Sequence, residues 1–221
     1  MNQNKNIAVI GGGAAGFFAA LSVKYHHPKY EVCLFEKTSK VLAKVKVSGG
    51  GRCNVTNNTL DIDRLIEAYP RGGKNLKNIF YRFNTDDTKT WFEERGVILK
   101  TESDGRVFPV SNSSQTIIDC LTQEANSLGV KIEFNVNIKS IKLTNGYWEL
   151  KFDDSNPNYF FDRVIVASGG SPKESGFYWL KNLGHIITSP VPSLFTFNLP
   201  KNPVNQLMGL VVKKVRLKVK G

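Results

Sequence analysis

A glycine-rich turn near the N-terminus constrains the fold of this chain more than any other feature. The apolar run 7–10 predicts a strand buried on both faces of a parallel sheet, and the pattern after residue 16 predicts a helix. A second apolar run, 30–35, ends on Glu36. Between the first strand and the helix, residues 11–16 fit the pattern G-x-G-x-x-G. This order of elements predicts a βαβ unit that binds a dinucleotide.

Each small residue of the turn has a role in that interpretation. Gly11 permits the tight turn, Gly13 lets the backbone approach a pyrophosphate, and Gly16 lets the helix pack closely against the strand. Ala14 and Ala15 lie between these glycines at the helix N-terminus. The free N–H groups and the positive dipole end of the helix attract phosphate there.

Glu36 supplies the acid that a dinucleotide site needs on its second strand. Its carboxylate is expected to accept hydrogen bonds from ribose hydroxyls and to disfavour a 2′-phosphate. The alternative is an ordinary βαβ turn in which Glu36 is a solvated charge. That alternative leaves the spacing of the glycines unexplained, so we favour dinucleotide binding.

The segment 37–57 suggests which dinucleotide is bound. It is a long, basic, glycine-centred connection, where an NAD domain would usually continue into a short crossover helix. Residues 48–52 can form a concave nest of N–H groups with the guanidinium of Arg52 at its rim. A second anion-binding element suits FAD, and the alternative is a flexible surface loop. Cys53 follows the nest, which can lower the pKa of its thiol, although a structural position is the favoured interpretation.

Residues 48–57, Ser-Gly-Gly-Gly-Arg-Cys-Asn-Val-Thr-Asn, resemble the signature of a group of bacterial flavoproteins. The group includes aminoacetone-oxidase-type enzymes and BaiN-like proteins linked to bile-acid reduction. Further stretches resemble it in the same order, at 105–112, 164–170, 183–185 and 192–194. The resemblance implies a flavoprotein of the type with two dinucleotide-binding domains, in which FAD exchanges a hydride with a substrate. Outside the first turn and Glu36, the residues then expected at the cofactor are Lys37, Lys44, Ser48, Gly49, Gly50, Gly51, Arg52, Cys53, Val136, Ala167 and Gly169.

Two departures from the family pattern bear on this expectation. The family usually has Gly-Arg-Lys shortly before the signature, whereas this chain has Ala-Lys-Val-Lys at 43–46. Family members are also longer, and a C-terminal glycine-rich strand–turn–helix completes their site around the flavin. We therefore expect an N-terminal portion of such a protein. Residues 1–190 would form the FAD-binding domain and 191–221 the beginning of a β-rich second domain.

The rest of the chain predicts an α/β fold, a Rossmann-like FAD-binding domain with an inserted β-meander. An Asn-Gly pair at 145–146 is a strong hairpin signal between two alternating runs. The remaining apolar and capping patterns predict helices at 60–68, 75–83, 86–96 and 115–128, and strands at 131–134, 138–143, 147–152 and 164–167.

The composition restricts the partners, the location and the kinds of site that we expect for this protein. The formal net charge is +11, but the lysines are scattered and no nucleic-acid motif stands out, which argues against a nucleic-acid partner. The basic run 211–220 alternates like a half-buried strand. No apolar run approaches the roughly 18 residues of a membrane span, and no signal peptide precedes residue 7, so a cytoplasmic protein is expected. Three separated cysteines indicate neither a disulfide framework nor a metal site.

Three hypotheses follow. The first is an FAD-dependent oxidoreductase of unidentified substrate, with NAD(P)H as candidate electron donor and unassigned catalytic residues. The second is an inactive or degenerate fragment that binds the cofactor without turnover. The third is a flavoprotein that acts on RNA.

Overall fold

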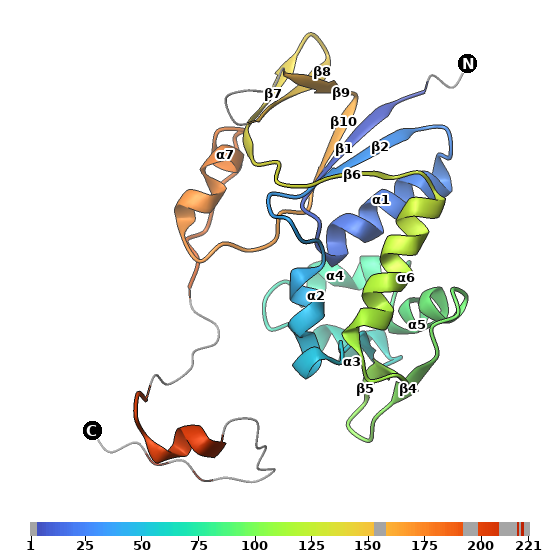
Figure 1. Ribbon diagram of the computed structural model, residues 1–221, viewed down its shortest axis with the longest axis vertical. Coiled ribbons are helices and arrows are strands. Elements are labelled where there is room, and N and C mark those ends of the chain that lie inside the picture. Colours follow the sequence, from blue (N-terminus) through green and yellow to red (C-terminus); the bar gives the residue numbers. More distant parts are fainter. Residues whose placement is uncertain (1–3, 153–157, 192–198, 208–215, 217, 219–221) are drawn as a thin grey trace.

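The computed structural model describes residues 4–152, 158–191, 199–207, 216 and 218 (Figure 1). Its centre is a parallel sheet with strand order β10-β1-β2-β6. The sheet strands are β1 (Asn6–Ile10), β2 (Glu31–Phe35), β6 (Lys131–Glu133) and β10 (Arg163–Val166). The predicted order of strand, helix and strand is therefore confirmed, with β1 next to β2.

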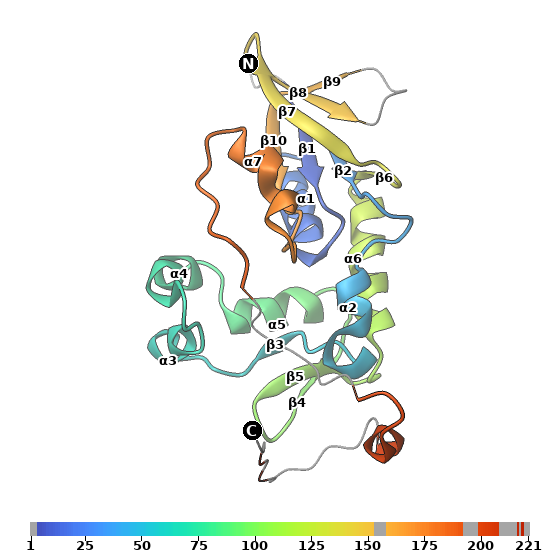
Figure 2. The ribbon, with the colours of Figure 1, turned by 90° about the vertical axis from the view of Figure 1, so that its left-hand side faces the viewer.

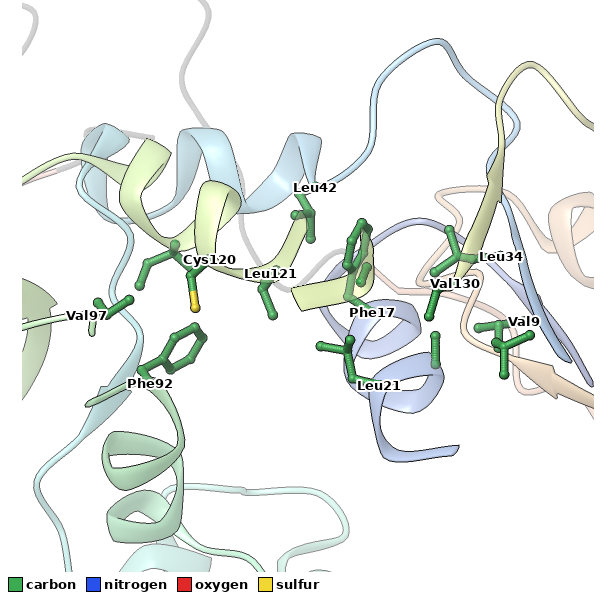
Figure 3. Packing of buried hydrophobic residues seen from close by; sticks show 14 of the residues in the cluster. Val9, Phe17, Leu21, Leu34, Leu42, Phe92, Val97, Cys120, Leu121 and Val130 are labelled. Atoms are coloured by element: carbon green, nitrogen blue, oxygen red, sulfur yellow. The ribbon is translucent and has the colours of Figure 1, made fainter. Parts of the chain in front are cut away.

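Two helices cover one face of the sheet, namely α1 (Ala14–His26) and α6 (Ser114–Ser127). Phe17 and Leu21 of α1 are fully buried between the sheet and α6 (Figure 3). The strands supply the facing residues of this core, including Val9 and Leu34. The alternation of strand side chains thus sends one set towards the helices and the other set to the opposite face.

An antiparallel meander covers that opposite face. Its strands are β7 (Ile138–Thr144), β8 (Tyr147–Phe152) and β9 (Tyr159–Phe161), in sequential order. Phe35 of the central sheet packs against Phe152 with the ring centroids 5.1 Å apart. Asn145 and Gly146 have φ values of 51° and 84°, as the predicted tight hairpin requires. The prediction of an inserted meander is confirmed.

A second, smaller lobe continues from the core and carries three short helices (Figure 2). These are α3 (Ile62–Glu67), α4 (Gly73–Phe80) and α5 (Thr85–Glu93). Asp61 caps α3, and Asn84 forms a capping box with Asp87 on α5. A small antiparallel sheet, which the sequence did not predict, lies below them with order β3 (Thr56–Asn57), β5 (Arg106–Pro109) and β4 (Leu99–Thr101).

The connection 37–57 is not a single irregular loop. It contains a short helix, α2 (Ala43–Val47), followed by a 3₁₀ turn, η1 (Ser48–Gly51). After β10 come a second 3₁₀ turn, η2 (Glu174–Phe177), and the one-turn helix α7 (Tyr178–Lys181).

The last segment carries a third 3₁₀ turn, η3 (Pro203–Leu207). The predicted strand at 211–220 falls almost entirely outside the described residues, so a β-rich second domain stays a prediction. Across the part of the chain that is described, every helix is too short or too polar to cross a membrane.

Candidate functional site

The glycine turn is built so that its first and last glycines cannot be replaced. Gly11 has φ +110°, and a Cβ added there would lie 2.4 Å from the carbonyl oxygen of Ala167. A Cβ on Gly16 would lie 1.9 Å from the carbonyl oxygen of Gly11. Both clashes are with backbone atoms, which cannot rotate away. The two glycines therefore hold β1, β10 and the start of α1 in close contact.

Gly13 has a different environment. Its backbone is extended, with φ −88°, and beyond its two chain neighbours no atom of the described residues lies within 4 Å of an added Cβ. Helix α1 starts directly after it with no side-chain cap and no acid in its first turn. The first N–H groups of a helix lack partners within the helix, so they and the positive end of the dipole face open space. This is the position predicted for a pyrophosphate.

Glu36 is fixed at the end of β2 above this turn. Its Oε2 accepts a hydrogen bond of 2.9 Å from the backbone N–H of Gly12. Its Oε1 accepts bonds of 2.9 Å and 2.8 Å from the N–H and the hydroxyl of Thr38. The backbone carbonyl of Glu36 accepts from the N–H of Val136, at 2.9 Å. The predicted ribose acceptor is thus oriented in advance, although the sequence did not reveal its bonds within the protein.

Lys44 reaches the same region through α2. The N–H of Leu42 donates to the carbonyl of Gly12 at 2.7 Å, which ties the start of α2 to the glycine turn. The ammonium group of Lys44 then lies beside the end of β10, 3.7 Å from where a Cβ on Gly169 would be. A cation therefore lies next to the loop that follows β10.

A cavity of about 300 Å³ lies at the carboxyl ends of β1, β2 and β10. Open α/β sheets bind their ligands at this edge. The predicted residues that line it are Gly11, Glu36, Lys37, Val136 and Gly169. Phe177 and Trp179, which the sequence reasoning missed, form another part of its wall. Their only sequence signal is an aromatic cluster shortly after the predicted strand at 164–167.

The predicted anion nest folds as a glycine-dependent turn. Gly49, Gly50 and Gly51 have φ values of 56°, 69° and 85°. The guanidinium of Arg52, however, pairs with Glu102 at 2.6 Å and lies 4.0 Å above the ring centroid of Phe108. Its charge is directed at the small sheet. The cavity wall contains no residue of the segment 48–53, and it also leaves out the predicted residues Gly13, Ala14, Ala15, Gly16, Lys44 and Ala167.

The thiol of Cys53 does not have the environment that the sequence reasoning considered. Burial raises its pKa, and a hydrogen bond with Ser48 only partly offsets that effect. Burial likewise raises the pKa of Cys120, and it raises that of Cys33 to about 12, with a contribution from Glu133. The lowered pKa considered for Cys53 is therefore not found, and its burial agrees with the structural position that the sequence favoured. Among the described residues, no three His, Cys, Asp or Glu side chains gather to hold a metal ion.

A parallel sheet, a glycine turn leading into α1 and an acid at the end of β2 define an α/β protein with a Rossmann-type FAD-binding fold. Residues 5–214 match the sequence model described as the HI0933-like protein Rossmann domain. The chain belongs to that family.

Curated relatives are about twice as long as this chain or longer. A 3-dehydro-bile acid delta(4,6)-reductase of Clostridium scindens is 27% identical over 210 residues, which cover 92% of this chain and 50% of that protein. A ribosomal RNA dihydrouridine synthase of Haemophilus influenzae is 24% identical over 172 residues, which cover 77% of this chain and 41% of that protein. The chain thus spans half or less of the length of these relatives.

Solved structures show the same fold at low identity. A flavocytochrome c3 fumarate reductase in its open conformation matches with a TM-score of 0.58 and 21% identity, over 82% of this chain and 37% of that one. The 3-ketosteroid-delta4-(5alpha)-dehydrogenase of Rhodococcus jostii matches with a TM-score of 0.58 and 14% identity, over 80% of this chain and 48% of that one.

Proposed function

We propose that this chain is the FAD-binding part of a flavin-dependent oxidoreductase, and that it holds the ADP half of the cofactor. The observation that carries the proposal is the open space at Gly13. Apart from its two chain neighbours, no described residue has an atom within 4 Å of its missing side chain, and the uncapped start of α1 faces the same space. Backbone N–H groups around an unfilled space are suited to a pyrophosphate.

The residues around the turn fit the remainder of an ADP group. The carboxylate of Glu36 is fixed by three hydrogen bonds from Gly12 and Thr38, and the lone pair that is left on Oε2 can accept from a ribose hydroxyl. The ammonium of Lys44 supplies a positive charge beside Gly169. Phe177 and Trp179 offer apolar surface to an adenine in the cavity wall.

The redox chemistry belongs to the flavin, which exchanges a hydride with its substrate when bound. The role of this chain is to bind the cofactor and to orient it. A rigid turn held by Gly11 and Gly16 fixes the pyrophosphate, and Glu36 fixes the ribose relative to it. Because the bile-acid relative is named a reductase and a reductase needs an electron donor, we propose NAD(P)H for that role.

The fragment hypothesis is the alternative within this proposal. The proposed contacts serve the ADP half alone, and the segment 48–53 lies outside the cavity wall. A chain with these contacts alone would bind FAD and show little turnover, since catalysis also requires the flavin ring to be positioned and shielded from water.

The absorption spectrum of the purified protein tests the proposal. We expect flavin bands near ~450 nm, and a released cofactor that is FAD rather than FMN. Steady NAD(P)H oxidation by the same sample would support the full oxidoreductase, and its absence with FAD bound would support the fragment hypothesis. A protein that takes up no flavin when incubated with FAD would contradict both.

A further inference from the structure

The segment 69–83, here called the α4 surface, carries a local pattern of charge and aromatic side chains. It runs Tyr-Pro-Arg-Gly-Gly-Lys-Asn-Leu-Lys-Asn-Ile-Phe-Tyr-Arg-Phe, with basic and aromatic residues interleaved. No acid occurs between Glu67 and Asp86. The expectation against nucleic acid rested on the scatter of lysines along the whole chain. The local pattern in this segment is one that the overall scatter does not describe.

The aromatic residues of the α4 surface are exposed to solvent. Tyr81 is 63% exposed, and Tyr69 and Phe83 are each 42% exposed. Tyr69 is held against Phe80 at 5.5 Å between centroids, and Phe83 is held against Phe18 at 6.3 Å. The rings of Phe80 and Phe18 thus hold the exposed rings of Tyr69 and Phe83 in place. Burial in the core does not explain why three large rings face water.

The positive charges of the surface are largely unneutralised. Lys77 pairs with Asp63, but Arg71, Lys74 and Arg82 have no ion pair or side-chain hydrogen bond to any described residue. The acids on the flanking helices are mostly engaged. Asp61 and Asp87 serve as caps and Asp86 pairs with Lys89, while Glu67 and Glu93 lack such a partner within the described part of the chain.

A cavity adjoins the end of the α4 surface. It has a volume of about 790 Å³ and lies between α1 and α5, where Arg82 and Phe83 form part of its wall beside Tyr25 and Trp91. Figure 2 shows α3 and α4 standing apart from the central sheet, on a projecting lobe. A flexible polymer can therefore lie along the lobe and insert a planar group at this end.

We propose that the α4 surface binds single-stranded RNA. Unpaired cations contact phosphates, and exposed rings stack on bases, which is how proteins hold single strands without reading their sequence. Folded RNA presents unpaired bases in loops and bulges, whereas a duplex keeps its bases stacked inside. The proposal goes beyond FAD binding and does not depend on it, because the α4 surface shares no residue with the cavity at Gly11.

Fluorescence anisotropy with a labelled oligouridine of about 16 nucleotides tests the proposal in the absence of FAD. Tyr81→Ala should weaken binding about tenfold, because one stacking platform is lost, and should leave the salt dependence unchanged. Tyr81→Phe keeps the ring and should bind like the wild type. Tyr147→Ala is the matched control, since Tyr147 is 50% exposed on the distant β7–β8 hairpin.

The lysine and arginine variants give a second, independent readout. Lys74→Ala and Arg82→Ala should each reduce the slope of log Kd against log salt by about 0.7, the value for one phosphate contact on a single strand. Lys151→Ala on β8 should leave the slope unchanged. Circular dichroism checks that the variants are folded, and the flavin spectrum should not change in any of them.

Two results would overturn the proposal. One is equal RNA affinity in the wild type, Tyr81→Ala and Arg82→Ala. The other is binding to duplex DNA or heparin as tight as to the oligouridine with no effect of Tyr81→Ala, which would show attraction of any polyanion rather than a surface for single strands.

Discussion

At the scale of single residues, the glycines of the turn have different surroundings, which predicts different outcomes on replacement. Gly13→Val should abolish FAD binding and leave the melting temperature near that of the wild type. The extended backbone accepts a valine and, beyond the two chain neighbours, no atom of the described residues lies within 4 Å of the new Cβ, so the side chain fills the ligand's space. Calorimetric titration and thermal unfolding measure the two effects.

Gly16→Val is the contrasting control for that experiment. Its Cβ would lie 1.9 Å from the carbonyl oxygen of Gly11, so this variant should lose stability as well as binding. If Gly13→Val bound FAD as the wild type does, the phosphate would have to lie elsewhere.

Replacing Glu36 should weaken the contact between the protein and the adenosine side of the cofactor. Glu36→Ala should weaken FAD by about 1 to 3 kcal/mol, because a charged acceptor for the ribose hydroxyls is removed. The spectrum of bound flavin should not shift. Thr38→Val is the matched control, since it removes the 2.8 Å bond to Glu36 and keeps the carboxylate. An equal loss in both variants would mean that Glu36 only supports the loop.

The three cysteine thiols should react slowly with alkylating reagents in the native protein. Burial raises the pKa of the Cys53 and Cys120 thiols, and raises that of Cys33 to about 12. A raised pKa keeps a thiol protonated, so alkylation near pH 8 should be slow in the native protein and fast after denaturation. The native state also favours the neutral thiol of Cys33, so its contribution to stability is complete below pH 9.0 and falls as the pH rises towards about 12. Mass spectrometry after a timed pulse of iodoacetamide measures the alkylation of each cysteine. Fast alkylation of Cys53 in the native protein would contradict the prediction.

At the scale of elements, the α2–η1 segment separates two basic residues that the sequence placed in one site. Lys44 lies beside Gly169, whereas Arg52 pairs with Glu102 over Phe108. Lys44→Ala should weaken FAD binding, and the loss should shrink at high salt because Lys44 is exposed. Arg52→Ala should instead lower the stability by about 1 kcal/mol, as expected for a partly exposed pair.

Glu102→Ala removes the other half of the Arg52 pair and serves as the control. It should match Arg52→Ala in unfolding experiments and leave FAD affinity unchanged. A larger loss of FAD affinity in Arg52→Ala than in Lys44→Ala would show that Arg52 contacts the cofactor.

The elements that the sequence predicts are those with local signals. The βαβ unit follows from an apolar run, a glycine turn and an acid, and the β7–β8 hairpin follows from Asn145-Gly146, whose positive φ values the turn requires. The helix α6 is set by its apolar face and by Ser113, which caps it through the N–H of Gln115. These features depend on contacts within a few residues along the chain.

The missed features depend on contacts between distant segments. Helix α2 is placed by the bond from Leu42 to Gly12, and the short strand β3 exists only through its pairing with β5. The partner of Arg52 is Glu102, which is 50 residues away along the chain. Trp179 reaches the cavity wall because α7 packs against the meander. Periodicity and turn motifs carry no information about such pairs.

At the scale of the whole molecule, two separate regions serve two kinds of ligand in this account. The edge of the central sheet, where β1, β2 and β10 end, faces the cavity assigned to the ADP group. The lobe of α3 and α4 carries the cationic and aromatic surface assigned to RNA. The relatives named for a bile acid and for ribosomal RNA both resemble this chain in sequence and differ in what their names say they act on. Specificity in such a fold resides in its sites.

Calorimetric titration of the purified chain with ADP, FAD and FMN is the most direct test of whether the glycine turn and Glu36 hold the ADP half of FAD. ADP and FAD should compete for one site with Kd values within about tenfold of each other, a difference of about 1.4 kcal/mol, because the same contacts bind both. FMN, which lacks the adenosine, should not bind, and Gly13→Val should bind none of the three. Binding of FMN, or of FAD without ADP, would contradict the account.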